Sequence, residues 1–122
     1  MKKNLHGKIT VNICTKQDMR ILFRQTPGND GVWGKYRFLL NDNENKHDWL
    51  LVVDDPKLDY ATELPLERRL LIQSEPVTIK RYPPRYLEQF GATISSVPNQ
   101  AGDERNVLTH VAVPWMFGVR FE

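Results

Sequence analysis

Glu75 has the sequence neighbours expected of a reactive carboxylate. It closely follows the apolar, strand-like run Leu70–Ile72, and Pro76 after it prevents a strand from continuing. In an open α/β sheet, reactive groups lie in the crevice beyond the carboxyl ends of the strands. A glutamate there could act as a general base. It could equally be a solvated loop residue, and its immediate neighbours leave both interpretations open.

Other charged residues stand near the ends of the apolar runs. Asp54 and Asp55 directly follow the run 49–53, so they should share an edge with Glu75 if the two strands are parallel. A divalent metal would need further oxygen ligands or a phosphate, and a solvated turn is the simpler interpretation. We therefore expect no metal site. Lys80 and its neighbour Arg81 could hold an anionic group or simply be solvated.

Two aromatic residues, Trp33 and Tyr82, fall in segments predicted to be loops. We expect these loops to gather near the strand ends. Aromatic side chains exposed at a cleft suit a sugar, because a pyranose ring has apolar faces. The alternative is that both rings anchor their loops.

The elements that would position these residues are short strands alternating with loops or short helices. The run 49–53 is apolar at every position, which is typical of a strand covered on both faces in a parallel sheet. This pattern favours an α/β fold with a mostly parallel, Rossmann-like sheet. Strands are predicted at 8–14, 36–40, 49–53, 69–73, 92–96 and 107–113, helices at 15–24 and 83–90, and loops at 25–34, 57–67 and 98–105.

Length and composition predict a single domain over residues 1–122 and exclude several classes of function. The net charge is only +2 with scattered cations, so we expect no nucleic-acid partner. Cys14 is the only cysteine, which excludes an intrachain disulfide, and we expect a buried, inert thiol. No glycine-rich nucleotide fingerprint or hydrolase nucleophile motif is present, so no cofactor site is predicted.

No apolar run approaches the roughly 18 residues that a transmembrane helix needs. The basic start Met1–Lys3 is not followed by the apolar segment of a signal peptide. We expect a cytoplasmic protein without a transmembrane segment, and leave open a peripheral contact with the inner membrane.

Several blocks in order along the chain resemble the amino-terminal part of bacterial glycosyltransferase family 10, the fucosyltransferase family. The resemblance covers nearly the whole chain and is carried by Arg-Gln-Thr-Pro-Gly at 24–28, Gly-Val-Trp-Gly at 31–34, His-Asp-Trp-Leu-Leu-Val-Val-Asp-Asp at 47–55, the block 71–91, and Val-Pro-Trp-Met-Phe-Gly at 113–118. It implies the amino-terminal half of a GT-B architecture, in which two Rossmann-like domains enclose the active site. In such enzymes the amino-terminal domain faces the acceptor sugar and the carboxy-terminal domain binds the GDP-sugar donor.

By this resemblance Glu75 is the catalytic base, and Lys80, Tyr82 and Trp33 are candidates for lining the acceptor side. The family pattern has Thr-Gly before the glutamate, whereas this chain has Gln73-Ser74. Serine would alter the loop backbone if a positive φ is required there. The carboxylate itself is kept.

The resemblance implies that the chain is the acceptor-side domain of an inverting, fucosyltransferase-like glycosyltransferase. The complete enzyme would use GDP-fucose as donor and a glycan as acceptor. The donor-binding domain is expected after Glu122, and the 122 residues alone would then be inactive. The alternatives are a non-catalytic module that binds a glycan or a protein, and an inactive fragment.

Overall fold

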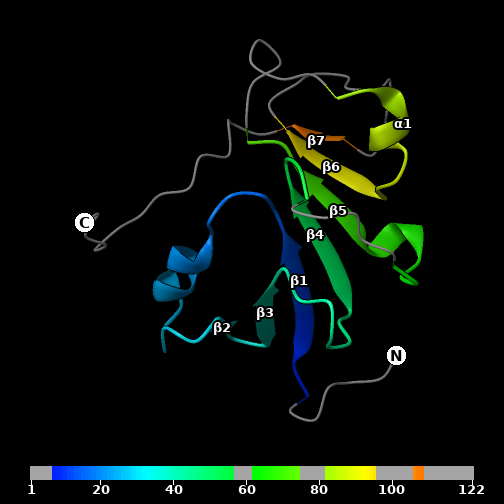
Figure 1. The fold of residues 1–122 in the computed structure, drawn as a ribbon. Helices are drawn as coiled ribbons and strands as arrows, with labels where there is room; N and C mark the ends of the chain where they lie inside the picture. Colours follow the sequence, from blue (N-terminus) through cyan, green and yellow to red (C-terminus); the bar gives the residue numbers. More distant parts are fainter. Residues whose placement is uncertain (1–6, 57–61, 75–81, 96–105, 109–122) are drawn as a thin grey trace.

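A mostly parallel sheet of seven strands is the centre of the computed structural model, which describes residues 7–56, 62–74, 82–95 and 106–108 (Figure 1). Its spatial order is β2-β3-β1-β4-β5-β6-β7, and among these described strands only the pairing of β2 with β3 is antiparallel. The α/β fold class predicted from the sequence is confirmed at this level. The strands are β1 (Ile9–Cys14), β2 (Val32–Trp33), β3 (Tyr36–Leu40), β4 (Trp49–Val53), β5 (Arg69–Ile72), β6 (Ala92–Ser95) and β7 (Asn106–Leu108).

The order of the parallel strands fixes where a ligand site is expected. The six parallel strands lie in the order β3-β1-β4-β5-β6-β7. If they are numbered 1 to 6 along the chain, this order is 2-1-3-4-5-6, which extends the doubly wound order 2-1-3-4-5. From β1 the chain first adds β3 on one side, and then places β4 and all later strands on the other. Ligands of such sheets bind beyond the carboxyl ends of the strands at this reversal. The ends of β1 and β4 are therefore the expected place for a site.

Apolar side chains pack on both faces of the sheet, because successive residues of a strand point to opposite faces. Leu50 and Val52 of β4 face one hydrophobic cluster, whereas Leu51 and Val53 face the other. This confirms the prediction that the run 49–53 is covered on both sides. The first cluster comprises Cys14, Leu50, Val52, Leu71, Tyr82, Leu87 and Phe90, with Leu64 and Tyr86 packed against it. The second comprises Ile13, Met19 and Val53, with Phe38, Leu40, Leu51 and Ile72 packed against it.

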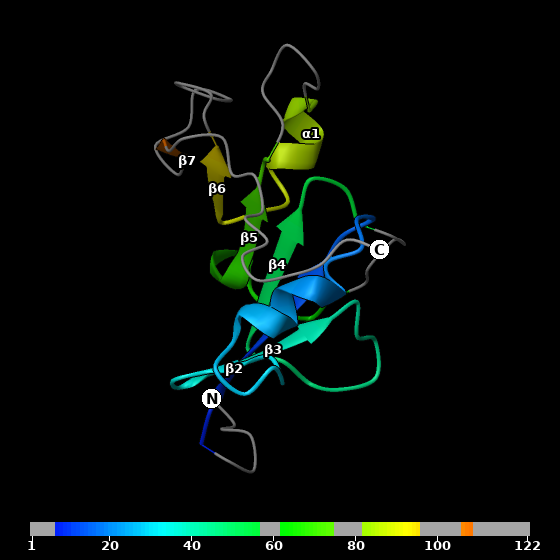
Figure 2. The same cartoon turned by 90° about the vertical axis from the view of Figure 1, so that its left-hand side faces the viewer.

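The helices are short and lie on opposite sides of the sheet. The 3₁₀ helix η1 (Arg20–Gln25) lies on one side and α1 (Pro84–Leu87) on the other (Figure 1), and the rotated view places η1 in front of the strands (Figure 2). A further 3₁₀ turn, η2 (Leu66–Arg68), leads into β5. None of the helices in the described part of the chain is long and apolar enough to cross a membrane.

The predicted helix over 15–24 is wrong in its first half. The Thr15 hydroxyl accepts a hydrogen bond from the Gln17 N–H and donates one to the Val53 carbonyl. Asp18 then accepts the Arg20 N–H. These bonds between side chains and backbone compete with helix formation, so the helix begins only at Arg20.

The helix predicted over 83–90 is shorter than expected, because only Pro84–Leu87 is helical. Gly91, which follows this segment, is required by close packing. A Cβ at this position would lie 2.7 Å from the Cα of Glu67, which is closer than real Cβ atoms approach. The loop therefore needs glycine here to pass over η2.

The polar residues of β1 are buried, although its alternating pattern correctly predicted a strand. Thr10 and Asn12 are buried because β1 lies between β3 and β4. The Asn12 amide is satisfied by the backbone of Asp42, to which it donates at 2.6 Å and from which it accepts at 3.1 Å. Cys14 is buried as predicted.

Candidate functional site

The carboxyl ends of β1, β4 and β5 bring three segments of polar residues to one edge of the sheet. Thr15 follows β1, Asp54 follows β4 and Ser74 lies just beyond β5, and all three residues are buried. The parallel pairing of these strands explains why segments distant in sequence meet there. This is the edge at which the strand order predicts a ligand site.

Asp54 is the centre of a hydrogen-bond network at this edge. Its Oδ1 atom accepts the Ser74 N–H at 2.9 Å, and its Oδ2 atom accepts the Ser74 hydroxyl. The Gln17 side-chain amide donates to Oδ2 at 3.0 Å. Asp54 has a φ of 59°, a left-handed conformation that aspartate tolerates better than most residues. The carboxylate thus ties together the segments that leave β1, β4 and β5.

Tyr86 connects α1 to the same edge. Its hydroxyl donates a hydrogen bond of 2.7 Å to the backbone carbonyl of Asp54. Burial raises the pKa of Tyr86, and the negative charges of Asp55 and Asp54 raise it further. The phenol therefore stays neutral at physiological pH and keeps its role as a donor.

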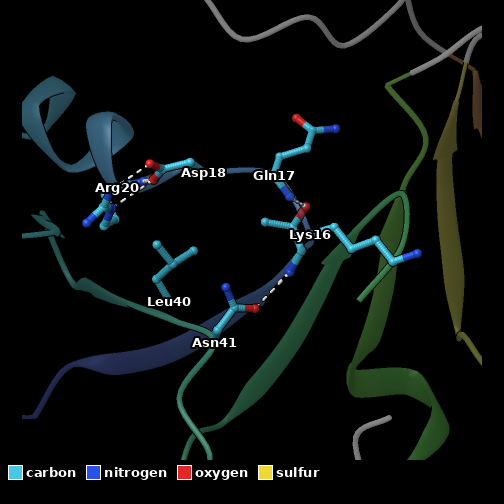
Figure 3. A pocket seen from close by; sticks show the side chains of 7 residues that line it. Lys16, Gln17, Asp18, Arg20, Leu40 and Asn41 are labelled. Carbon is cyan, nitrogen blue, oxygen red and sulfur yellow. Dashed lines mark hydrogen bonds and ion pairs between the residues drawn. The ribbon is translucent and has the colours of Figure 1, made fainter. Parts of the chain in front are cut away.

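A pocket of about 390 Å³ opens beside the ends of β1 and β3 (Figure 3). Its volume falls in the range of roughly 300–1,000 Å³ that is usual for small-molecule sites. Asn41, which follows β3 with a φ of 48°, accepts the Thr15 N–H at 3.0 Å and so links two walls of the pocket. The lining residues are Thr15, Lys16, Gln17, Asp18, Arg20, Leu40 and Asn41.

The two cationic residues that line the pocket, Arg20 and Lys16, differ in whether they form an ion pair. Arg20 forms an ion pair of 2.7 Å with Asp18, and both side chains are well exposed. The Lys16 side chain points away from this pair (Figure 3), and its ammonium makes no ion pair within the part of the chain that the structure describes. Its backbone is fixed by a hydrogen bond of 2.9 Å from the Lys16 N–H to the Asp55 carbonyl. Lys16 is thus an anchored residue with a charge that a ligand could use.

The pocket has the chemistry of a binding site for a small polar molecule. Gln17 and Asn41 supply side-chain amides, Lys16 a charged donor and Leu40 an apolar surface. Among the described residues that line it, only Leu40 is apolar, so the pocket is more polar than most small-molecule sites and suits a ligand rich in hydrogen-bonding groups. Across residues 7–56, 62–74, 82–95 and 106–108, no group of three or more His, Cys, Asp or Glu is placed to hold a metal ion.

Two of the site residues predicted from the sequence, Glu75 and Lys80, lie outside the described residues. The residue before Glu75 is well placed, because Ser74 is held by Asp54 at the carboxyl edge. The roles of Glu75 and Lys80 therefore stay predictions.

Tyr82 does not have the exposure that its predicted role requires. Its side chain is only 8% exposed and belongs to the hydrophobic cluster with Leu87 and Phe90. Its ring stacks on that of Tyr86, with 5.0 Å between the centroids. The expectation of an exposed cleft aromatic is wrong here, and the alternative, a ring that anchors its loop, agrees with this packing.

Trp33 is exposed as expected but lies at the opposite edge of the sheet. It is the last residue of β2 and pairs with Tyr36, which in turn pairs with Ile9 at the start of β1. The expectation that Trp33 lies near the strand ends is therefore wrong. The segment before β3 runs back along the sheet and carries Trp33 to the amino ends of the parallel strands.

Several residues of this edge were not predicted from their sequence pattern. Asp54 was expected to belong to a solvated turn, whereas its side chain is buried and hydrogen-bonded. No role was predicted for Lys16, Gln17 or Asn41. The available signal was their position, because each closely follows a correctly predicted strand.

In comparisons with known proteins, no family model, no curated protein and no solved structure matches this chain.

Proposed function

We propose that this chain is the acceptor-side, amino-terminal domain of an inverting, fucosyltransferase-like glycosyltransferase of GT-B architecture. The observation that carries the proposal is the anchoring of Ser74, the residue before Glu75, by the Asp54 carboxylate. This network lies at the edge where doubly wound sheets bind ligands. The ordered blocks that resemble the fucosyltransferase family supply the reaction type.

In this proposal Glu75 is the general base. Its carboxylate accepts the proton of an acceptor hydroxyl while that oxygen forms a bond to the anomeric carbon of the donor sugar. The bond from the anomeric carbon to the GDP phosphate breaks on the opposite face, and GDP leaves with the electron pair. Displacement from the opposite face inverts the anomeric configuration.

The pocket beside β1 and β3 supports a role in acceptor binding. Sugar hydroxyls both donate and accept hydrogen bonds. Gln17 donates to Asp54 and Asn41 accepts from Thr15, so the Gln17 carbonyl oxygen is the acceptor and the Asn41 amino group the donor that these amides offer to a ligand. Lys16 adds a donor without an ion-pair partner among the described residues. We propose that these side chains hold one ring of the acceptor and Lys80 contacts it from the segment after Glu75. The donor GDP-fucose would bind residues outside this chain.

The binding part of the proposal is tested by titrating the purified 122-residue chain with a panel of oligosaccharides and with GDP-fucose. We expect saturable binding of an oligosaccharide that Lys16→Ala weakens. Arg85→Ala is the matched control, because Arg85 is an exposed cation on α1, outside the pocket. Tight binding of GDP-fucose would contradict the placement of the donor site elsewhere. Sugar transfer by this chain alone would contradict the division of the active site between two domains.

A second candidate is a module that binds a glycan without transferring a sugar. It is favoured by the pocket itself, because Asp18, the one carboxylate among the described residues that line it, is paired with Arg20. Both candidates predict oligosaccharide binding. They differ in transfer activity, because only the enzyme requires Glu75 and a donor domain in the complete protein.

A further inference from the structure

The turn that joins β2 to β3 presents two large aromatic side chains to solvent. We call residues 32–37 the aromatic hairpin. Trp33 is 56% exposed and Tyr36 is 38% exposed, and the two residues pair directly across the strands. The connecting residues are Gly34 and Lys35, and Gly34 has the positive φ of 60° that two-residue hairpin turns require. The exposed rings therefore stand on a defined turn.

The hairpin is held firmly by the body of the protein. The Tyr36 ring lies 6.5 Å from that of Phe38, which packs against the core cluster of Ile13, Met19 and Val53. The Phe38 N–H also donates to the Gly31 carbonyl at 2.8 Å. Exposure increases from Phe38 through Tyr36 to Trp33. The aromatic stripe thus continues a core face outward into solvent.

Two lysine side chains lie at the aromatic hairpin. Residues 32–37 include Lys35 and Arg37 and no carboxylate. The Lys35 ammonium lies 5.5 Å from the centroid of the Tyr36 ring, and Lys8 donates from Nζ to the Gly34 carbonyl at 2.9 Å. Lys8 and Lys35 therefore lie beside the hairpin, and Arg37 adds a third cation on the other face of β3.

The aromatic hairpin lies at the opposite end of the sheet from the candidate site. Tyr36 pairs with Ile9 at the start of β1, whereas the pocket opens where β1 ends. Figure 1 shows β2 at the far side of the sheet from α1. Neither the pocket of Figure 3 nor the cavity beside α1 is lined by Trp33 or Tyr36. A partner bound here would leave the candidate site open.

We infer that the aromatic hairpin is a contact for the surface of an anionic lipid membrane. Tryptophan and tyrosine favour the boundary between headgroups and acyl chains, because one part of each ring system is apolar and the other polar. Lysine and arginine are attracted to anionic headgroups. A tight turn that projects two rings beside Lys8 and Lys35 offers a membrane both interactions together. This inference does not depend on the proposed transferase function.

The test is co-sedimentation of the purified 122-residue chain with sucrose-loaded vesicles. One set contains phosphatidylcholine alone and the other contains phosphatidylcholine with phosphatidylglycerol. We expect binding to the anionic vesicles at low salt and little binding to the neutral ones. Trp33→Ala should weaken binding, and Lys35→Glu should weaken it by at least roughly fivefold, since each cation near a membrane contributes about 1 kcal/mol. Arg85→Glu, the same charge reversal on an exposed residue of α1, should keep most of the binding.

Three results would overturn the inference. The first is a lack of binding to anionic vesicles. The second is an equal loss of vesicle binding for Arg85→Glu and Lys35→Glu, which would indicate that the net charge of the protein alone attracts it to the membrane. The third is a concentration-dependent dimer that Trp33→Ala abolishes without any effect on vesicle binding, which would assign the hairpin to a second copy of the chain. Far-ultraviolet circular dichroism of each variant confirms that the fold is retained.

Discussion

The carboxylate of Asp54, directly after β4, accepts hydrogen bonds from both the backbone N–H and the hydroxyl of Ser74, two residues beyond β5. This pair fastens the ends of two neighbouring parallel strands at the edge where a ligand site is expected. It also fixes the residue from which the chain continues to Glu75.

Replacement of Asp54 by alanine should destabilise the fold by about 2–4 kcal/mol, because hydrogen bonds to a buried carboxylate are lost and Ser74 is left unsatisfied. Asp54→Asn should cost less, since asparagine tolerates the left-handed backbone and keeps one carbonyl acceptor. Urea unfolding monitored by circular dichroism measures both changes. An alanine variant as stable as the wild type would show that this network contributes nothing.

The stability of the protein should fall at alkaline pH in a way that depends on Tyr86. Its pKa is raised in the folded state by burial and by Asp55 and Asp54, so the unfolded state releases this proton at lower pH. The contribution is fully present below the unfolded pKa of about 10 and is lost as the pH rises from there toward the folded pKa.

Tyr86→Phe removes the titrating hydroxyl together with its hydrogen bond to Asp54. The variant should be less stable near neutral pH and should lose less stability than the wild type above about pH 10. Urea unfolding over a series of pH values compares the two proteins. If the free energy of unfolding of the two proteins changed with pH in the same way, the result would argue against a raised pKa for Tyr86.

Leu71 should be among the most sensitive core positions. Its side chain is fully buried on β5 within the cluster that contains Leu50 and Val52. Leu71→Ala should cost about 2–5 kcal/mol, as expected for a large cavity in a packed core. Leu66→Ala is a matched control, because Leu66 is 38% exposed and the same truncation there should have a much smaller effect. Equal losses at the two positions would contradict the packing described.

The sequence predicted the strands well because their signal is local. Runs such as Trp49–Val53 and Arg69–Ile72 are apolar at positions that face both sides of the sheet, and they are strands in the structure. The helices were predicted less well. The bonds of Thr15 and Asp18 to nearby backbone groups override the apolar spacing that suggested a helix there.

The site could be predicted only in part, because its contacts join distant segments. The edge itself was anticipated from the apolar run that precedes Glu75. The burial of Asp54 was not, since it depends on Ser74 and Gln17 in two other segments. Trp33 was assigned to the wrong edge because a single antiparallel turn reverses the chain before β3.

The central claim is that Glu75 is the general base of a sugar transfer, and the most direct measurement is kcat for Glu75→Gln in the complete natural polypeptide. With an oligosaccharide acceptor and GDP-fucose, we expect kcat to fall by about 10²–10⁴-fold, the usual contribution of a general base. Glu44→Gln, the same change at an exposed carboxylate, should leave kcat unchanged. Near-wild-type turnover by a folded Glu75→Gln protein would contradict the assignment.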